Sequence, residues 1–209
     1  MKFFAILPFA GLALASPVVK RQYAGEDTQN QLKDGTPCRD YTIIFARGTT
    51  EDGNVGSLTG PPFFQAVAER VGSNNLAVQG VEYPADVDGF LAGGSAQGSQ
   101  NLADLARQAM AQCPDTKLTL SGYSQGAQLV HNAAEMLSAD TTAFVSSAVT
   151  FGDPEMDQPI GNIPDTRTLI ICHIGDNICE GGNLILPPHL NYAMDAGRAA
   201  NFVVAAAQL

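Results

Sequence analysis

A single serine stands between two glycines in the stretch TLSGYSQGAQLV, residues 119–130. The residues before this serine form a β-type run, and those after it repeat apolar side chains at helical spacing. A sharp turn from strand to helix forces the residue at its tip into unfavourable backbone angles. The flanking positions then lie too close to neighbouring backbone for a side chain, so glycine is required there. No other feature of the chain limits its possible folds so strongly.

The same turn is suited to catalysis. Residues 122–126 match the pattern G-x-S-x-G in the strand-to-helix context that this pattern needs. The turn would lift the Ser124 hydroxyl into the open, and the amide of Gln125 would point to the place where an oxyanion forms. An ordinary turn is the alternative, but its position between strand and helix favours a nucleophile.

Short apolar runs alternate with helix-like segments along most of the chain. The strand candidates are residues 41–46, 76–81, 117–120, 144–151 and 168–172. The helix candidates are residues 61–71, 95–112, 126–137 and 195–208. The strand candidates are β-branched, aromatic and not strictly alternating, which is typical of a parallel sheet covered on both faces. The sequence therefore predicts an α/β fold with a central, mostly parallel five-stranded sheet and helices on both faces.

The first 16 residues are typical of a secretory signal peptide. Lys2 gives a basic start, residues 3–14 are apolar, and residues 13–15 form an A-x-A cleavage signal. The apolar run is too short to span a bilayer comfortably, and no other segment is long enough. We therefore expect a secreted, extracellular protein with no stable membrane insertion.

Lys20 and Arg21 form a dibasic pair of the kind that processing proteases cut. We assign residues 17–36 to a short propeptide followed by a polar, mobile lead-in. Residues 37–209 then form a single domain, because no internal repeat or low-complexity linker interrupts them.

The chain is strongly acidic, with 11 Lys and Arg against 21 Asp and Glu. Removal of residues 1–21 leaves 8 basic and 21 acidic residues, a net charge near −13. A net anion does not bind nucleic acid by neutralising phosphates, so no nucleic-acid partner is expected. The same charge keeps the protein dispersed in water, and we expect a monomer.

Four cysteines in an exported chain predict two disulfides, for which three pairings are possible. Cys172 and Cys179 lie close together around a turn, whereas Cys38 and Cys113 each precede a strand-like run. We expect the pairs Cys172–Cys179 and Cys38–Cys113. The chain has no C-x-x-C pair and its three histidines are scattered, so no metal or other cofactor is expected.

A serine nucleophile needs a base, and the chain offers three histidines. His131 lies seven residues beyond Ser124, about 10 Å along the helix at ~1.5 Å per residue, which is too far. We predict that it is a surface or groove histidine. His173 directly follows the last strand candidate and is predicted to be a strand-end residue. His189 lies in a proline-stiffened loop, which favours it as the base.

Two aspartates are candidates for the acid that orients the base. Asp153 and Asp176 both follow strand candidates, and α/β sites form at the carboxyl ends of strands. Asp176 falls inside the loop that Cys172 and Cys179 would close, which favours it. Asp153 remains the second candidate for the acid, and its other predicted role is to cap its loop.

Several motifs together resemble those of the fungal cutinases, small serine esterases of the α/β-hydrolase fold without a large lid. They are FARGTTE at 45–51, GNVG at 53–56, GYSQG at 122–126, CHIGDNIC at 172–179 and PHLNY at 188–192. The resemblance runs from about Cys38 to the C-terminus. It implies a triad of Ser124, Asp176 and His189, and it implies the same cysteine pairing.

The resemblance also implies an oxyanion hole made by Gln125 and Thr49. The family often has serine where Thr49 stands, so this chain keeps the hydroxyl and adds a methyl group. This methyl group could crowd the hole or restrict the rotamer of the hydroxyl.

Two apolar groups are either part of the core or the rims of an open cleft. They are Val87, Phe90 and Leu91, and Leu184, Ile185 and Leu186. The resemblance favours rims, because in cutinases two such loops flank a site that meets an insoluble polyester.

The function expected from the sequence is hydrolysis of cutin polyester and of short-to-medium acyl esters through an acyl-enzyme. An acetylxylan esterase is the alternative, because it shares the fold and the GYSQG motif. FGDP at 151–154 and YPA at 83–85 match that branch, whereas the apolar stretch at 184–186 is unsuited to a sugar. A non-catalytic protein that adheres to wax or cell wall is the second alternative.

Overall fold

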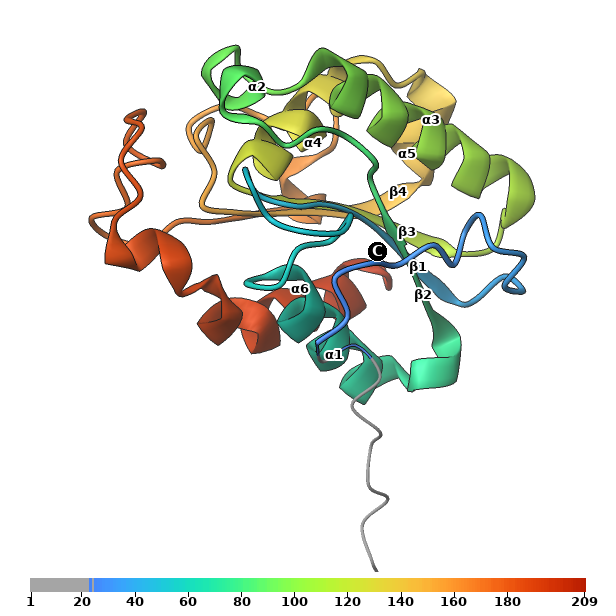
Figure 1. The fold of residues 1–209 in the computed structure, drawn as a ribbon. Coiled ribbons are helices and arrows are strands. Elements are labelled where there is room, and N and C mark those ends of the chain that lie inside the picture. The colour runs from blue at the N-terminus through green and yellow to red at the C-terminus, as the bar shows by residue number, and fades with distance from the viewer. Residues whose placement is uncertain (1–22, 24) are drawn as a thin grey trace, which may run out of the picture.

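The computed structural model describes Tyr23 and residues 25–209, so the expected signal peptide and dibasic site lie outside the described residues. A parallel sheet with strand order β2-β1-β3-β4-β5 forms the centre (Figure 1). Its strands are β1 (Tyr41–Ala46), β2 (Leu76–Gly80), β3 (Lys117–Tyr123), β4 (Val145–Phe151) and β5 (Thr168–Ile171). The predicted fold class is confirmed.

Helices cover both faces of the sheet. Helices α1 and α6 lie on one face, and α2 to α5 lie on the other (Figure 1). The helices are α1 (Gly60–Val71), α2 (Val87–Leu91), α3 (Ala96–Gln112), α4 (Gln125–Glu135), α5 (Ala139–Phe144) and α6 (Ala196–Ala206). The described residues also form four short 3₁₀ segments, η1 (Ser73–Asn75), η2 (Asp165–Arg167), η3 (Pro187–Leu190) and η4 (Tyr192–Asp195). Helices α2 and α5 were not predicted, because five or six residues are too few to show helical periodicity.

The inner strand β1 is almost continuously apolar because both of its faces are buried. Ile43 and Phe45 belong to the core cluster shared with α1 and α6, whereas Ile44 and Ala46 belong to the cluster shared with α3 and α4. Successive side chains of a strand point to opposite faces, and both faces are covered here. Burial of each large apolar side chain contributes about 1.5–3 kcal/mol, so both faces of β1 stabilise the sheet.

Strand β3 is longer than predicted and reaches the predicted nucleophile. Its last residues pair with both neighbours, since Gly122 is in register with Ala46 of β1 and with Thr150 of β4. Because the strands are parallel, the segments that follow β1, β3, β4 and β5 all meet at the carboxyl edge of the sheet. The four candidate catalytic segments are therefore brought together by topology.

The described part of the N-terminal lead-in is packed, contrary to the expected mobile segment. The amide of Gln31 donates to the Val78 carbonyl at 3.0 Å, and the amide of Gly80 donates to the Gln29 carbonyl at 2.8 Å. Tyr23 is buried. The segment covers the exposed edge of β2, where unpaired backbone groups need partners.

Both predicted disulfides, Cys38–Cys113 and Cys172–Cys179, are confirmed. The first spans 75 residues and joins the segment before β1 to the end of α3. In the chain-entropy model a loop of that size stabilises the folded state by about 4 kcal/mol. Within the described residues, no helix has the length and apolar character needed to cross a membrane.

Candidate active site

Ser124 occupies a strained turn between β3 and α4. Its backbone has φ 57° and ψ −119°, outside the regions that serine ordinarily adopts. A Cβ on Gly122 would lie 2.1 Å from the Gly126 carbonyl oxygen, and one on Gly126 would lie 2.0 Å from that of Ala46. Both glycines are therefore required, as predicted. Such backbone strain costs of order 1–3 kcal/mol and clusters at active sites.

Helix α4 begins directly after the serine, at Gln125. The first amides of a helix have no intrahelical acceptor and carry a partial positive charge, so the Gln125 N–H is suited to an anion. The Gln125 side chain donates from Nε2 to Thr49 Oγ1 at 2.9 Å and to the Asp86 carbonyl at 2.8 Å. It thus joins the loop after β1 and the start of α2 to the start of α4. Because Thr49 Oγ1 accepts this bond, its own hydrogen is available for donation.

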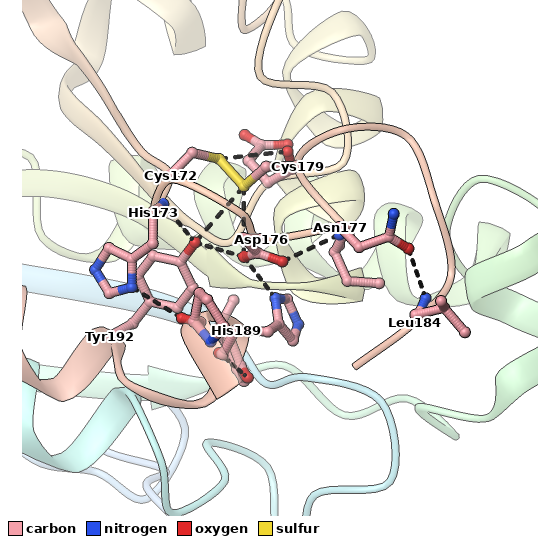
Figure 2. A network of polar contacts seen from close by, with 12 residues as sticks. Cys172, His173, Asp176, Asn177, Cys179, Leu184, His189 and Tyr192 are labelled. Carbon is pink, nitrogen blue, oxygen red and sulfur yellow. Dashed lines mark hydrogen bonds and ion pairs between the residues drawn. A yellow bond between two sulfur atoms is a disulfide. The ribbon is translucent and has the colours of Figure 1, made fainter. Parts of the chain in front are cut away.

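Asp176 and His189 form a buried pair in the network of Figure 2. His189 Nδ1 lies 2.8 Å from Asp176 Oδ2, while Asp176 Oδ1 accepts the Ile178 amide at 3.0 Å. The carboxylate therefore favours the imidazole tautomer that carries its hydrogen on Nδ1. Among the described residues Nε2 has no hydrogen-bond partner, and His189 lines the same cleft as Ser124. An unprotonated Nε2 in the cleft that Ser124 also lines can accept a proton.

Two tyrosines support this pair. The Tyr192 hydroxyl donates to Asp176 Oδ2 at 2.6 Å, and the Tyr123 hydroxyl donates to the His189 carbonyl at 2.8 Å. The Tyr123 ring also stacks on the imidazole, with 5.1 Å between centroids. Burial raises the pKa of both hydroxyls above the ordinary value, so they remain donors into the alkaline range. The supporting role of these tyrosines was not predicted, because neither has a local sequence signature of such a role.

Asp153, the other candidate acid, lies in a separate buried network. Its Oδ2 accepts from Thr150 Oγ1 at 2.6 Å and lies 2.9 Å from His131 Nε2, and its Oδ1 accepts the Glu155 amide at 2.9 Å. It does cap its loop. The prediction that His131 lies at the surface or in a groove is wrong, because its pairing with Asp153 holds it in the interior. Burial lowers the pKa of His131. The hydrogen bond to Asp153 and the negative charges of Asp153 and Glu155 raise it by more, so the net pKa lies above the ordinary value.

An open cleft of about 490 Å³ contains Ser124, His189 and Thr49. Of the six predicted rim residues, the cleft is lined by Val87, Phe90 and Ile185. Val87 is 54% exposed and Ile185 is 57% exposed, which excludes a place in the core.

The other three predicted rim residues lie outside the cleft lining. Leu91, Leu184 and Leu186 are exposed beside it, with the Leu184 amide bound to Asn177 Oδ1 at 2.9 Å (Figure 2). Two apolar residues that line the cleft, Leu58 and Leu190, were not predicted. Each is a lone leucine among polar or small neighbours, so no apolar run indicated it.

The arrangement of strained serine, buried Asp–His pair and open cleft can be compared with known proteins. The family model described as Cutinase matches residues 37–207. The chain belongs to the cutinase family. The cutinase of Botryotinia fuckeliana is 56% identical over 172 residues, which cover 82% of this chain and 85% of that protein.

Solved structures agree with this membership of the cutinase family. Trichoderma reesei cutinase, in complex with a C11Y4 phosphonate inhibitor, is 49% identical and has a TM-score of 0.82. The match covers 87% of this chain and 80% of that one. An acetylxylan esterase structure has a TM-score of 0.68 at 22% identity, covering 81% of this chain and 99% of that one. At that identity the likeness to the esterase shows the fold alone.

Proposed function

We propose that this chain is a secreted, monomeric serine esterase that hydrolyses cutin polyester and short-to-medium acyl esters through an acyl-enzyme. The observation that carries the proposal is the meeting, in one cleft, of the strained Ser124 with the buried Asp176–His189 pair. Membership of the cutinase family supports the same chemistry.

In the first half-reaction, Ser124 Oγ attacks the ester carbonyl while its proton passes to His189 Nε2. Asp176 stabilises the imidazolium that forms. The negative charge on the carbonyl oxygen is met by the Gln125 amide and the Thr49 hydroxyl. His189 then gives the proton to the departing alcohol, and the acyl group stays on Ser124.

In the second half-reaction, a water molecule takes the place of the alcohol. His189 accepts a proton from this water as the water attacks the acyl carbon. The tetrahedral intermediate uses the same two donors for its oxygen. Its collapse returns the proton to Ser124 and releases the carboxylic acid, so the enzyme is regenerated without any added cofactor.

The substrate follows from the form of the cleft. Exposed apolar side chains beside an open site are suited to an acyl chain or to the surface of an insoluble polyester. A cleft of about 490 Å³ also accommodates short nitrophenyl esters.

A substrate panel tests the proposal. We expect purified protein to hydrolyse nitrophenyl butyrate at least as well as the acetate, and to release monomers from cutin. Strict preference for acetate, with release of acetate from acetylated xylan, would favour the acetylxylan esterase instead. A protein that adsorbs to cutin but hydrolyses none of these esters would indicate the non-catalytic alternative.

Thr49→Val tests the proposed oxyanion donor. Loss of one such donor typically costs about 2.7–4 kcal/mol of transition-state stabilisation, so kcat for nitrophenyl butyrate should fall about 10²–10³-fold. KM should change little, because the donor acts on the transition state. Thr49→Ser is the matched control: it keeps the hydroxyl and should retain kcat within a few-fold. A large rise in KM with unchanged kcat would contradict the assignment.

A further inference from the structure

His173 has two ring nitrogens that both face oxygen acceptors. Nδ1 lies 2.8 Å from the Pro188 carbonyl oxygen, and Nε2 lies 2.6 Å from Asp195 Oδ2. Neither a carbonyl nor a carboxylate can donate, so both ring nitrogens must carry hydrogen for both bonds to form. This is the imidazolium form. In the neutral form one nitrogen would present its lone pair to an oxygen.

These contacts join the loop of the proposed acid to the loop of the proposed base (Figure 2). On one side, the His173 carbonyl accepts the Asp176 amide at 3.0 Å. On the other, His173 binds the carbonyl of Pro188, the residue directly before His189. The His173 ring also stacks on Tyr192, with 4.1 Å between centroids.

Tyr192 extends this connection to the carboxylate. The His173 amide donates to the Tyr192 hydroxyl at 3.0 Å, and that hydroxyl donates to Asp176 Oδ2 at 2.6 Å. His173 therefore meets the acid–base pair by its ring, its amide and its carbonyl. No other described histidine contacts either loop in this way.

The segment that carries the base depends on such contacts. His189 lies in η3, a four-residue 3₁₀ segment, and η4 follows immediately with Asp195 at its end. Short 3₁₀ segments have little intrinsic stability, so tertiary contacts must hold them. The His173 ring supplies one contact at the start of this pair of segments and one at the end.

We propose that protonated His173 is a positioning residue for the esterase reaction, one that holds His189 against Asp176 by bridging the Pro188 carbonyl and the Asp195 carboxylate. This inference rests on the proposed function. His173 touches neither substrate nor the reacting atoms, and it acts through the placement of His189.

The charge around His173 determines how the bridge responds to pH. Asp195 and Tyr192 face it from η4, and Asp176 faces it from its own loop. Partial burial lowers the pKa of His173, but the hydrogen bonds to Asp195 and Pro188 and the two carboxylate charges raise it above the ordinary value. A raised pKa means that both hydrogen bonds of the bridge are formed at pH values below the ordinary pKa of histidine. It is lost as pH rises through the pKa of the folded state.

His173→Phe tests the proposal directly. Phenylalanine keeps a ring to stack on Tyr192 but removes both donors. Since a misplacement of about 1 Å can cost about 10²-fold in rate, we expect kcat for nitrophenyl butyrate to fall at least about tenfold, with KM within about twofold. The wild type should show an alkaline decline in kcat that the variant lacks.

Asp195→Asn is a second variant that keeps the shape of the contact. Without the carboxylate charge the pKa of His173 falls, so the alkaline decline should move to lower pH. A variant that merely loosened the fold would not shift the profile in this way. Should His173→Phe fail to fold, the direction of this shift decides the question alone.

Ile174→Gln provides the control in the same loop. Ile174 follows His173 but is fully exposed, and its substitution should leave kcat and the pH profile unchanged. Unfolding curves should show every assayed variant folded at the assay temperature. The inference is overturned if activity needs Ser124 while His173→Phe keeps the kcat and alkaline decline of the wild type. Activity that survives Ser124→Ala would instead overturn the proposed function.

Discussion

Ser124→Ala is expected to lower kcat for nitrophenyl butyrate by about 10⁶-fold, the size seen when a serine nucleophile is removed from a comparable triad. No covalent intermediate can form without the hydroxyl. The fold should persist, because alanine adopts the φ of 57° about as poorly as serine does. Steady-state kinetics and a thermal unfolding curve on the same preparation measure both effects.

Ser138→Ala is the matched control for this substitution. Ser138 caps α5 by accepting the Thr141 amide at 3.2 Å, and it does not line the cleft. Its loss should cost about 1 kcal/mol of stability and leave kcat unchanged. A Ser124→Ala protein that keeps more than about a hundredth of the wild-type kcat would exclude Ser124 as the nucleophile, since the triad mechanism predicts a far larger loss.

Asp176→Asn is expected to lower kcat about 10⁴-fold while leaving the backbone in place, as the same change does in a serine protease triad. The Ile178 amide donates to Oδ1, so the asparagine oxygen will take that position. The amide NH₂ then occupies the place of Oδ2 and donates toward His189 Nδ1. His189 must accept there and carry its hydrogen on Nε2. An imidazole with hydrogen on Nε2 cannot take the proton of Ser124.

Asp153→Asn separates the two aspartates that follow strands. It disturbs the buried contact with His131, so the free energy of unfolding should fall, but kcat should stay near the wild-type value. The pH dependence of kcat/KM for the two variants, measured with one soluble ester, completes the comparison. If Asp153→Asn lost activity by orders of magnitude and Asp176→Asn did not, the assignment of the acid would be reversed.

The strands could be predicted because the apolar side chains that favour each strand lie within that strand. The span of β1 agrees with the predicted residues 41–46, since a strand covered on both faces needs apolar side chains at nearly every position. The clash that demands glycine at Gly122 involves Gly126, only four residues away. The clash at Gly126 involves Ala46 of β1, so half of the turn already depends on a distant strand.

Other features depend on partners far along the chain. The lead-in packs because β2 presents an open edge, and His131 is buried because Asp153 lies beside it. Nothing near either segment in the sequence indicates these partners. The short helices α2 and α5 were missed for a different reason, since each has less than two turns of pattern.

The sequence by itself determined the strand, the turn and the helix around Ser124, because the motif and the patterns on either side of it are local. The need for glycine at Gly126 also depends on Ala46 of the distant β1. The positions of Asp153 and Asp176 in the sequence did not decide which of them is the acid. Only the tertiary structure paired His189 with Asp176 and His131 with Asp153. Hydrogen bonds between loops depend on which strand ends the sheet topology places side by side, and that arrangement is decided by packing of the whole core.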